Sequence, residues 1–166
     1  MIDHSKASPD RSTGGLWQSI LAGTLATFPM TVFMLATQRF LPKGQRYDLP
    51  PEIITKDLAK RAHIKPFLNK QEIVAATLIS HFGYGAAMGA LYFPLERKRR
   101  ILAPVQGILF GLLVWAGSYL GLLPLLRMSA AGHREPGQRN LMMIAAHVVW
   151  GVTLGVTADY LPEKKN

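Results

Sequence analysis

Four long segments without a charged residue constrain the fold of this chain most. They cover residues 16–38, 73–95, 101–126 and 141–158, and each is 18 to 26 residues long. A helix of about 20 apolar residues is long enough to cross the hydrocarbon core of a bilayer. Four such segments are hard to bury in a soluble fold of 166 residues. The sequence therefore predicts an all-α integral membrane protein.

The residues that border these segments predict where the helices begin and end. We expect a disordered N-terminal tail over 1–15 and a C-terminal tail over 162–166. The transmembrane domain, 16–161, would hold helices over about 16–41, 70–95, 101–126 and 141–160. The first segment is longer than the apolar core of a signal peptide, so we expect it to be retained as a membrane helix.

Two connections carry further local signals. In the longest one, 42–70, two prolines followed by Glu52 are typical of a helix start, and Ile54, Leu58 and Ala62 would line one face. This helix either lies on the bilayer as an amphipathic segment or is a solvated linker. The connection 96–100 is short enough only for a tight hairpin between antiparallel helices.

The positive charge of the chain is explained by the membrane. The net charge of +9 lies in the loops, where lysine and arginine set orientation and contact anionic lipid, and no nucleic-acid-binding fold remains outside the spans. Raw counts of lysine and arginine favour an orientation with the two long loops in the cytoplasm. The density of positive charge at the 96–100 turn favours the opposite orientation, with both termini in the cytoplasm, and this second orientation is the one we expect. Contacts with lipid headgroups are expected from Arg97, Lys98, Arg99, Arg100 and Arg139.

A repeated motif relates the two halves of the chain. The pattern His-x-x-x-Gly-x-x-x-Gly occurs as His81, Gly85 and Gly89 and again, 66 residues later, as His147, Gly151 and Gly155. The repeat predicts a four-helix bundle built from two related helical hairpins. Because each unit would contain an even number of spans, the copies would run parallel, with the two histidines at similar depth.

The glycines of this motif are typical of helix contacts in membranes. Small residues at every fourth position let two helix backbones approach closely. We expect this role for the glycines of both copies and of the third span, namely Gly85, Gly89, Gly107, Gly111, Gly151 and Gly155. Alternatively, they leave room for a flat cofactor beside the helix.

His81 and His147 are the only side chains within the apolar segments that titrate near neutral pH. Since an unpaired polar group in an apolar medium costs roughly 2–7 kcal/mol, each ring needs a partner. The first interpretation is a structural hydrogen bond between helices. The second is axial ligation of a b-type haem. Against it, no propionate-binding arginine lies near the motif, since Arg127 and Arg139 are at the ends of the apolar segments. The third is a proton path. Two histidines alone provide too few ligands for a typical metal site.

The remaining sequence gives no sign of an active site. Cysteine is absent, which excludes disulfides, thiol catalysis and iron–sulfur ligation. We find no nucleophile–base arrangement, phosphate loop or pair of catalytic carboxylates, so we do not expect an enzyme. The first hypothesis is a non-enzymatic helix-packing or accessory subunit of a homo-oligomer or larger membrane complex. The alternatives are a bis-histidine haem protein in electron transfer and a small proton or solute conductor.

Three stretches resemble a known group of proteins. These are the run from Arg139 to Gly151, the run from Ser80 to Gly85, and Pro50-Pro51-Glu52. They are similar to small bacterial inner-membrane proteins of the YagU-like domain-of-unknown-function family, over about residues 16–160. The resemblance implies a multi-pass inner-membrane protein of bacterial source without an established biochemical activity, and it leaves open a role in acid tolerance. It supplies no catalytic residues.

Overall fold

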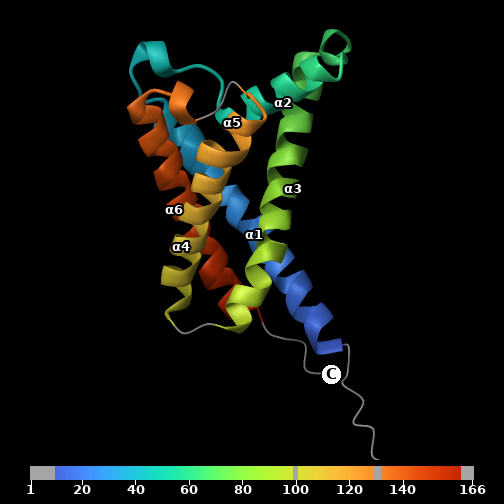
Figure 1. Ribbon diagram of the computed structural model, residues 1–166, viewed down its shortest axis with the longest axis vertical. Coiled ribbons are helices and arrows are strands. Elements are labelled where there is room, and N and C mark those ends of the chain that lie inside the picture. The colour runs from blue at the N-terminus through green and yellow to red at the C-terminus, as the bar shows by residue number, and fades with distance from the viewer. Residues whose placement is uncertain (1–9, 99–100, 129–131, 162–166) are drawn as a thin grey trace, which may run out of the picture.

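The computed structural model describes residues 10–98, 101–128 and 132–161, which form helices and no strand. The long helices are α1 (Asp10–Gln38), α3 (Lys70–Arg97), α4 (Ala103–Ala116) and α6 (Gly137–Tyr160). After α4 the chain continues through a π-helical segment, η3 (Gly117–Leu122), into the short α5 (Leu123–Leu125). The connections contain α2 (Pro50–Arg61) and the 3₁₀ turns η1 (Lys43–Gln45), η2 (Lys65–Phe67) and η4 (Gly132–Arg134) (Figure 1).

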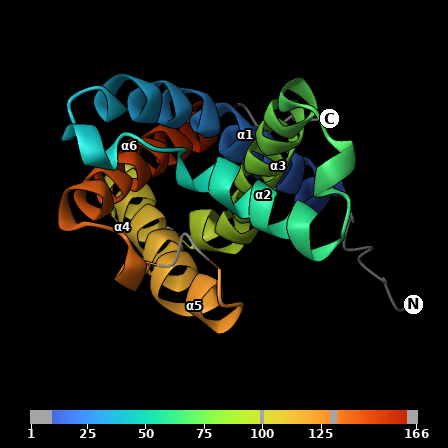
Figure 2. The ribbon, with the colours of Figure 1, turned by 90° about the horizontal axis from the view of Figure 1, so that it is seen from above.

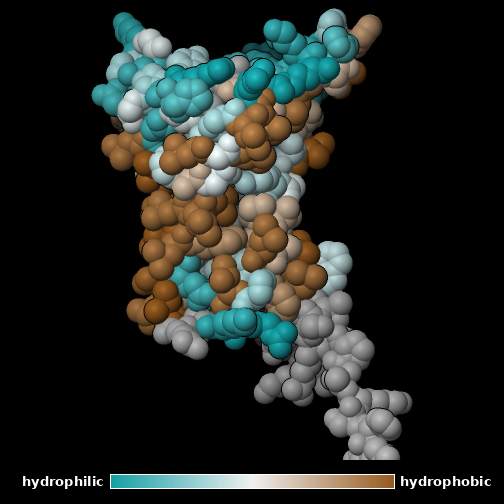
Figure 3. Space-filling model, viewed as in Figure 1, coloured by the Kyte–Doolittle hydropathy of each residue, from teal (hydrophilic) through white to brown (hydrophobic). Residues whose placement is uncertain are grey.

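Four helices are long and apolar enough to cross a membrane. They are Gly14–Gln38, Lys70–Arg97, Ala103–Leu125 and Gly137–Tyr160. Figure 3 shows apolar side chains around the middle of the molecule and polar side chains above and below them. The prediction of an all-helical chain is confirmed for the described residues, and the four long apolar helices are those that a multi-pass membrane protein requires.

The four spans do not all contact one another. α1 packs against both α3 and α6, and α4 packs against α6, whereas α3 and α4 hardly touch although they follow each other in the chain (Figures 1 and 2). The expectation of a tight antiparallel hairpin between these two helices is therefore wrong. The reason is that α3 is held by α1 and α4 is held by α6, so the two helices diverge.

Glycines lie where the helices of each pair meet. In the α1–α3 pair, a Cβ atom added at Gly23 would lie 2.8 Å from the Cα of Gly89 and would collide with the carbonyl oxygen of Gly85. The α4–α6 pair is equally close, because a Cβ added at Gly107 would collide with the carbonyl oxygen of Gly151. The other glycines predicted to pack at these two crossings lie there too, namely Gly111 and Gly155. Such contacts bring the two backbones together without a side chain between them.

Two helix ends differ from the sequence prediction. α1 begins at Asp10, so residues 10–15 are helical and are not a disordered tail. Gly15 lies against the ring of Phe93, which extends the α1–α3 contact toward the N-terminus. α6 begins at Gly137, four residues early, because the polar residues of its first turn find partners within the protein. The remaining tail residues, 1–9 and 162–166, lie outside the described residues.

Candidate functional site

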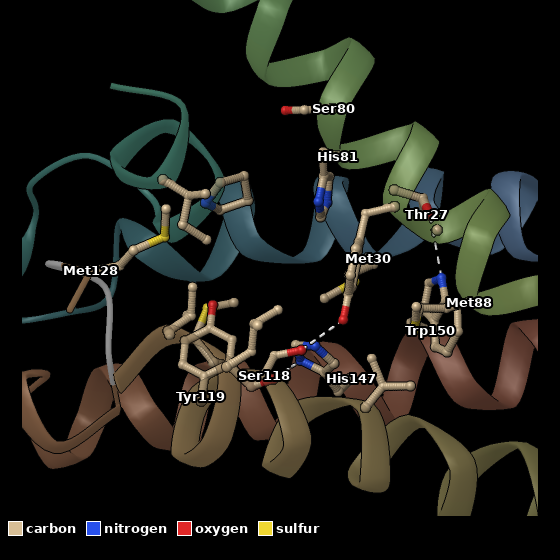
Figure 4. Close-up of a pocket in the computed structure, with 18 of the residues that line it drawn as sticks. Thr27, Met30, Ser80, His81, Met88, Ser118, Tyr119, Met128, His147 and Trp150 are labelled. Atoms are coloured by element: carbon tan, nitrogen blue, oxygen red, sulfur yellow. Dashed lines mark hydrogen bonds between the residues drawn. The ribbon is translucent and has the colours of Figure 1, made fainter. Parts of the chain in front are cut away.

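The divergence of α3 from α4 leaves a cavity of about 320 Å³ within the membrane-spanning part of the molecule. It is surrounded by α1, α3, α6 and the α4–η3–α5 span, and α2 contributes side chains at one end (Figure 4). The lining is mostly apolar and includes four methionines: Met30, Met88, Met128 and Met143. Ligand sites in proteins begin at about this volume and are typically apolar with a few polar groups.

One end of the cavity is closed by the helix crossings. The lining includes Trp150 on α6 and Gly85 on α3, which lie at the level of the glycine contacts. The indole Nε1 of Trp150 donates hydrogen bonds to the carbonyl oxygen of Gly23 (3.2 Å) and to the hydroxyl oxygen of Thr27 (3.3 Å). These bonds join α6 to α1 at this end of the cavity, and Figure 4 shows the one between Trp150 and Thr27. Trp150 and the close helix contacts therefore bound the cavity at this end.

The opposite end is covered by α2. Ile54 and Leu58 line the cavity, so the apolar face of this helix is turned toward the cavity. At its end, the Nη2 atom of Arg61 donates to the carbonyl oxygens of Leu126 (2.6 Å) and Arg127 (3.2 Å). A helix that sequence analysis assigned to the bilayer surface or to a linker therefore forms a wall of the cavity and is tied to the end of α5.

His147 enters the cavity from α6. Its Nδ1 lies 2.8 Å from the carbonyl oxygen of Met143, and its ring packs edge-on against Tyr119 at 5.9 Å between centroids. Because a carbonyl oxygen only accepts, Nδ1 carries the proton and Nε2 is the acceptor nitrogen of the neutral ring. The bond expected between helices is thus formed within α6 itself.

His81 enters the same cavity from α3 (Figure 4). Its Nε2 atom is buried and has no hydrogen-bond partner in the described part of the chain. The expected interhelical bond is therefore not made by this atom. A buried polar atom without a partner costs about 1–3 kcal/mol, which makes His81 the polar group of the lining that most needs a ligand.

A hydrogen bond crosses the cavity beside the two histidines. The hydroxyl groups of Tyr84 on α3 and Ser118 on η3 lie 2.7 Å apart, and either is able to donate. Ser118 belongs to the π-helical segment, which also carries Tyr119 and Leu122 of the lining. π-Helical turns inside α-helices are frequent at functional sites because they change the direction of neighbouring side chains.

Arg139 does not face lipid headgroups, so this prediction is wrong. Its side chain is 0% exposed, and Nε binds the carboxylate of Glu135 at 2.6 Å. Its Nη atoms donate to the carbonyl oxygens of Gln45, Tyr47 and Asp48, and the guanidinium lies over the Tyr47 ring at 3.7 Å. The connection that follows α1 folds over the start of α6, which encloses the arginine at the end of the bundle.

Of the other residues predicted to contact lipid headgroups, Arg97 and Lys98 lie at the C-terminal end of α3. Arg97 is exposed and its guanidinium lies 5.6 Å from the centroid of the Phe93 ring, and Lys98 is also exposed. Arg99 and Arg100 lie outside the described residues. Among the residues described, none that lines the cavity carries a charge, and Arg139 is already occupied. The lining therefore offers no cation for the propionates of a haem.

Two titratable groups near the α1–α2 connection have perturbed pKa values. Burial raises the pKa of Tyr47, and its hydrogen bond to Glu135 (2.8 Å) raises it further. Hydrogen bonds to Asp48 (2.5 Å) and Glu52 (2.7 Å) raise the pKa of Lys56. Both shifts favour the protonated forms, which hold this connection against α2 and α6.

Residues 31–156 match a family described as "Protein of unknown function (DUF1440)". The chain belongs to this family. The DUF1440 match includes every lining residue of the cavity except Thr27 and Met30. No curated protein matches the chain, and neither does a solved structure. A function for this DUF1440 protein has to be argued from the geometry of its site.

Proposed function

We propose that this protein is a non-enzymatic, multi-pass membrane protein that binds a small apolar molecule in the cavity between α3 and α4. The observation that supports this most is a mostly apolar, ligand-sized cavity into which His81 brings a buried nitrogen that has no partner in the described segments of the chain. Ligand sites combine an apolar wall with a small number of polar groups that fix orientation. We further propose that the protein lies in the bacterial inner membrane with both termini in the cytoplasm, and that it belongs to the YagU-like group of proteins.

The proposed internal repeat is supported by matching contacts. Gly85 and Gly89 lie against Gly23 on α1, and the corresponding Gly151 lies against Gly107 on α4. We infer two related hairpins, α1–α3 and α4–α6, that join through α1 and α6. In this arrangement α2 would lie at the membrane surface. One of its faces would cover the cavity, and the opposite face would point away from the bundle.

A role as a helix-packing subunit is less well supported than ligand binding. All six glycines that sequence analysis assigned to packing lie against another helix of the same chain. These stripes consequently present no surface to a second protein. A homo-oligomer or a larger complex would have to form through the lipid-facing side chains instead.

Conduction is also less well supported. A conductor needs a polar path between both sides of the membrane. Trp150 and the close backbone contacts of the glycine crossings bound the cavity at one end, so the polar groups of its lining do not continue past this level. A cavity closed at one end suits binding better than passage.

Bis-histidine haem ligation is the second candidate function. His81 and His147 line one cavity, and the Nδ1 bond of His147 leaves its Nε2 unprotonated, as axial ligation requires. The uncharged lining argues against it. Protein expressed with added haem and reduced with dithionite would show a Soret band that His147→Ala removes; a colourless preparation would overturn haem binding.

Tryptophan fluorescence tests the proposed binding function. Of the three tryptophans, only Trp150 lines the cavity, so Trp17→Phe with Trp115→Phe leaves one reporter. We expect 1-bromodecane to quench Trp150 saturably and decane to restore its emission. Ser118→Phe, which fills the cavity, should abolish the saturable component, whereas Leu120→Phe on the exposed face of η3 should preserve it. Quenching that is linear in every variant would contradict a binding cavity.

A further inference from the structure

We propose that the ligand of this cavity is an uncharged isoprenoid quinone that enters from the bilayer between α3 and the α4–η3–α5 span. Its ring carbonyls would accept hydrogen bonds from His81 and from the Tyr84–Ser118 pair. This inference rests on the proposed binding function and specifies the ligand class. Four features of the cavity support the quinone assignment: the charge of its lining, the hydrogen-bonding groups of the lining, its shape and its opening.

The charge of the lining selects a neutral ligand. The described lining residues include no lysine, arginine, aspartate or glutamate. The phosphate of a phospholipid or the carboxylate of a fatty acid would be an unpaired anion there, and an unpaired charge in an apolar site is strongly unfavourable. The headgroup in the cavity is therefore polar but uncharged.

The free hydrogen-bonding groups select carbonyl or hydroxyl oxygens. Nε2 of His81 has no partner among the residues that the structure describes, and a neutral imidazole nitrogen either donates or accepts, depending on its tautomer. The hydroxyls of Tyr84 and Ser118 share one hydrogen bond, so one of the two protons is left to donate to a ligand. A quinone carbonyl accepts from both sites, and a quinol hydroxyl is able to donate to His81.

The shape of the lining suits a flat ring. Tyr84, Tyr119 and Trp150 provide aromatic faces and edges within one cavity. Four methionines complete the wall, and their flexible thioethers adapt to a ring and contact its π-system favourably. The volume of about 320 Å³ accommodates a substituted ring, whereas a long isoprenoid tail has to extend outside it.

The position of the opening provides a route for such a tail. The lining residues Tyr84, Leu122 and Leu126 are 40–47% exposed, and they lie on the edges of α3 and of the η3–α5 segment that face each other. Figure 2 shows α3 well separated from α5 in the view along the bundle. These edges belong to apolar spans, so the opening faces the hydrocarbon of the bilayer. An isoprenoid tail that leaves the cavity here stays in lipid.

Calorimetric titration of the full-length protein in detergent with ubiquinone-1, which carries one isoprene unit, tests the inference. We expect saturable binding that His81→Ala and Tyr84→Phe each weaken about tenfold, the effect of losing one hydrogen bond to a ligand. His81→Gln, which keeps a donor, should recover part of the affinity. His63→Ala, a matched change at an exposed position outside the spans, should leave binding unchanged.

Two further titrations separate this inference from the proposed function. If decane binds the cavity and ubiquinone-1 binds no more tightly than decane, with no effect of His81→Ala, the quinone assignment is overturned and the binding function stands. If neither compound binds the folded protein, both proposals fail. Palmitate should not displace ubiquinone-1, and displacement at equal concentration would refute the selection for a neutral headgroup.

Discussion

A methyl group added at Gly151 should destabilise the protein through the α4–α6 crossing. The new Cβ atom would collide with the carbonyl oxygen of Gly107 and lie 2.8 Å from its carbonyl carbon and 3.0 Å from the Cα of Ile108. All three atoms belong to the backbone of α4, so no side chain is able to rotate away. The two helices must separate, and overpacking of this kind costs about 1–3 kcal/mol.

Gly121→Ala is the matched control for this substitution. It adds the same methyl group to the α4–η3–α5 span at a position where nothing lies within 4 Å. Both variants gain up to about 1 kcal/mol from the higher helix propensity of alanine. The difference between their free energies of unfolding, measured by circular dichroism in mixed micelles with increasing SDS, therefore reports the crossing alone. A Gly151→Ala protein as stable as Gly121→Ala would refute the close contact of α4 and α6.

Three other predictions follow from individual polar side chains. Arg139→Met should lower the free energy of unfolding by about 3–5 kcal/mol, because it leaves Glu135 as a buried charge without its partner, whereas the exposed Arg134→Met should change it by less than about 0.5 kcal/mol. His81→Phe should raise thermal stability, because it removes a buried nitrogen that has no partner among the described residues, and should weaken ubiquinone-1 binding about tenfold, as His81→Ala does. The raised pKa of Tyr47 means that its stabilising contribution is complete below about pH 10 and is lost as pH rises through the higher folded-state value, so Tyr47→Phe should weaken the alkaline decline in melting temperature.

The spans were predictable from the sequence because charge is segregated along it. A chain with four uncharged segments of membrane length has few other ways to satisfy its backbone and bury its side chains. α3 begins at Lys70, as predicted, and the reciprocal capping box of Asn69 and Glu72 fixes this start locally. These features depend on residues that are close together in the chain.

The cavity was not predictable, because it depends on how the spans diverge. The short connection between α3 and α4 suggested close packing, yet stronger contacts with α1 and α6 draw the two helices apart. The repeated motif drew attention to His81 and His147 equally. Only the folded structure shows that His147 bonds to the Met143 carbonyl, whereas Nε2 of His81 has no partner among the described residues. Tyr84 and Ser118 are brought together from separate spans, and no local pattern indicates their bond.

Arg139 shows the same limit at the end of the bundle. An arginine beside an apolar segment is typical of a headgroup contact, and the sequence contains nothing nearby that contradicts this interpretation. Three of its acceptors are backbone carbonyls from a connection more than 90 residues earlier in the chain. Every residue has a backbone carbonyl, so the sequence does not indicate which carbonyls will accept hydrogen bonds from a buried arginine.

Anomalous scattering of bromine from crystals soaked with 1-bromodecane would show where an apolar molecule binds this protein. We predict a bromine peak between α3 and the α4–η3–α5 span, inside the cavity lined by His81, Ser118 and His147, and no such peak in the Ser118→Phe variant. Bromine confined to the outer, lipid-facing surface, with α3 packed directly against α4, would contradict the account.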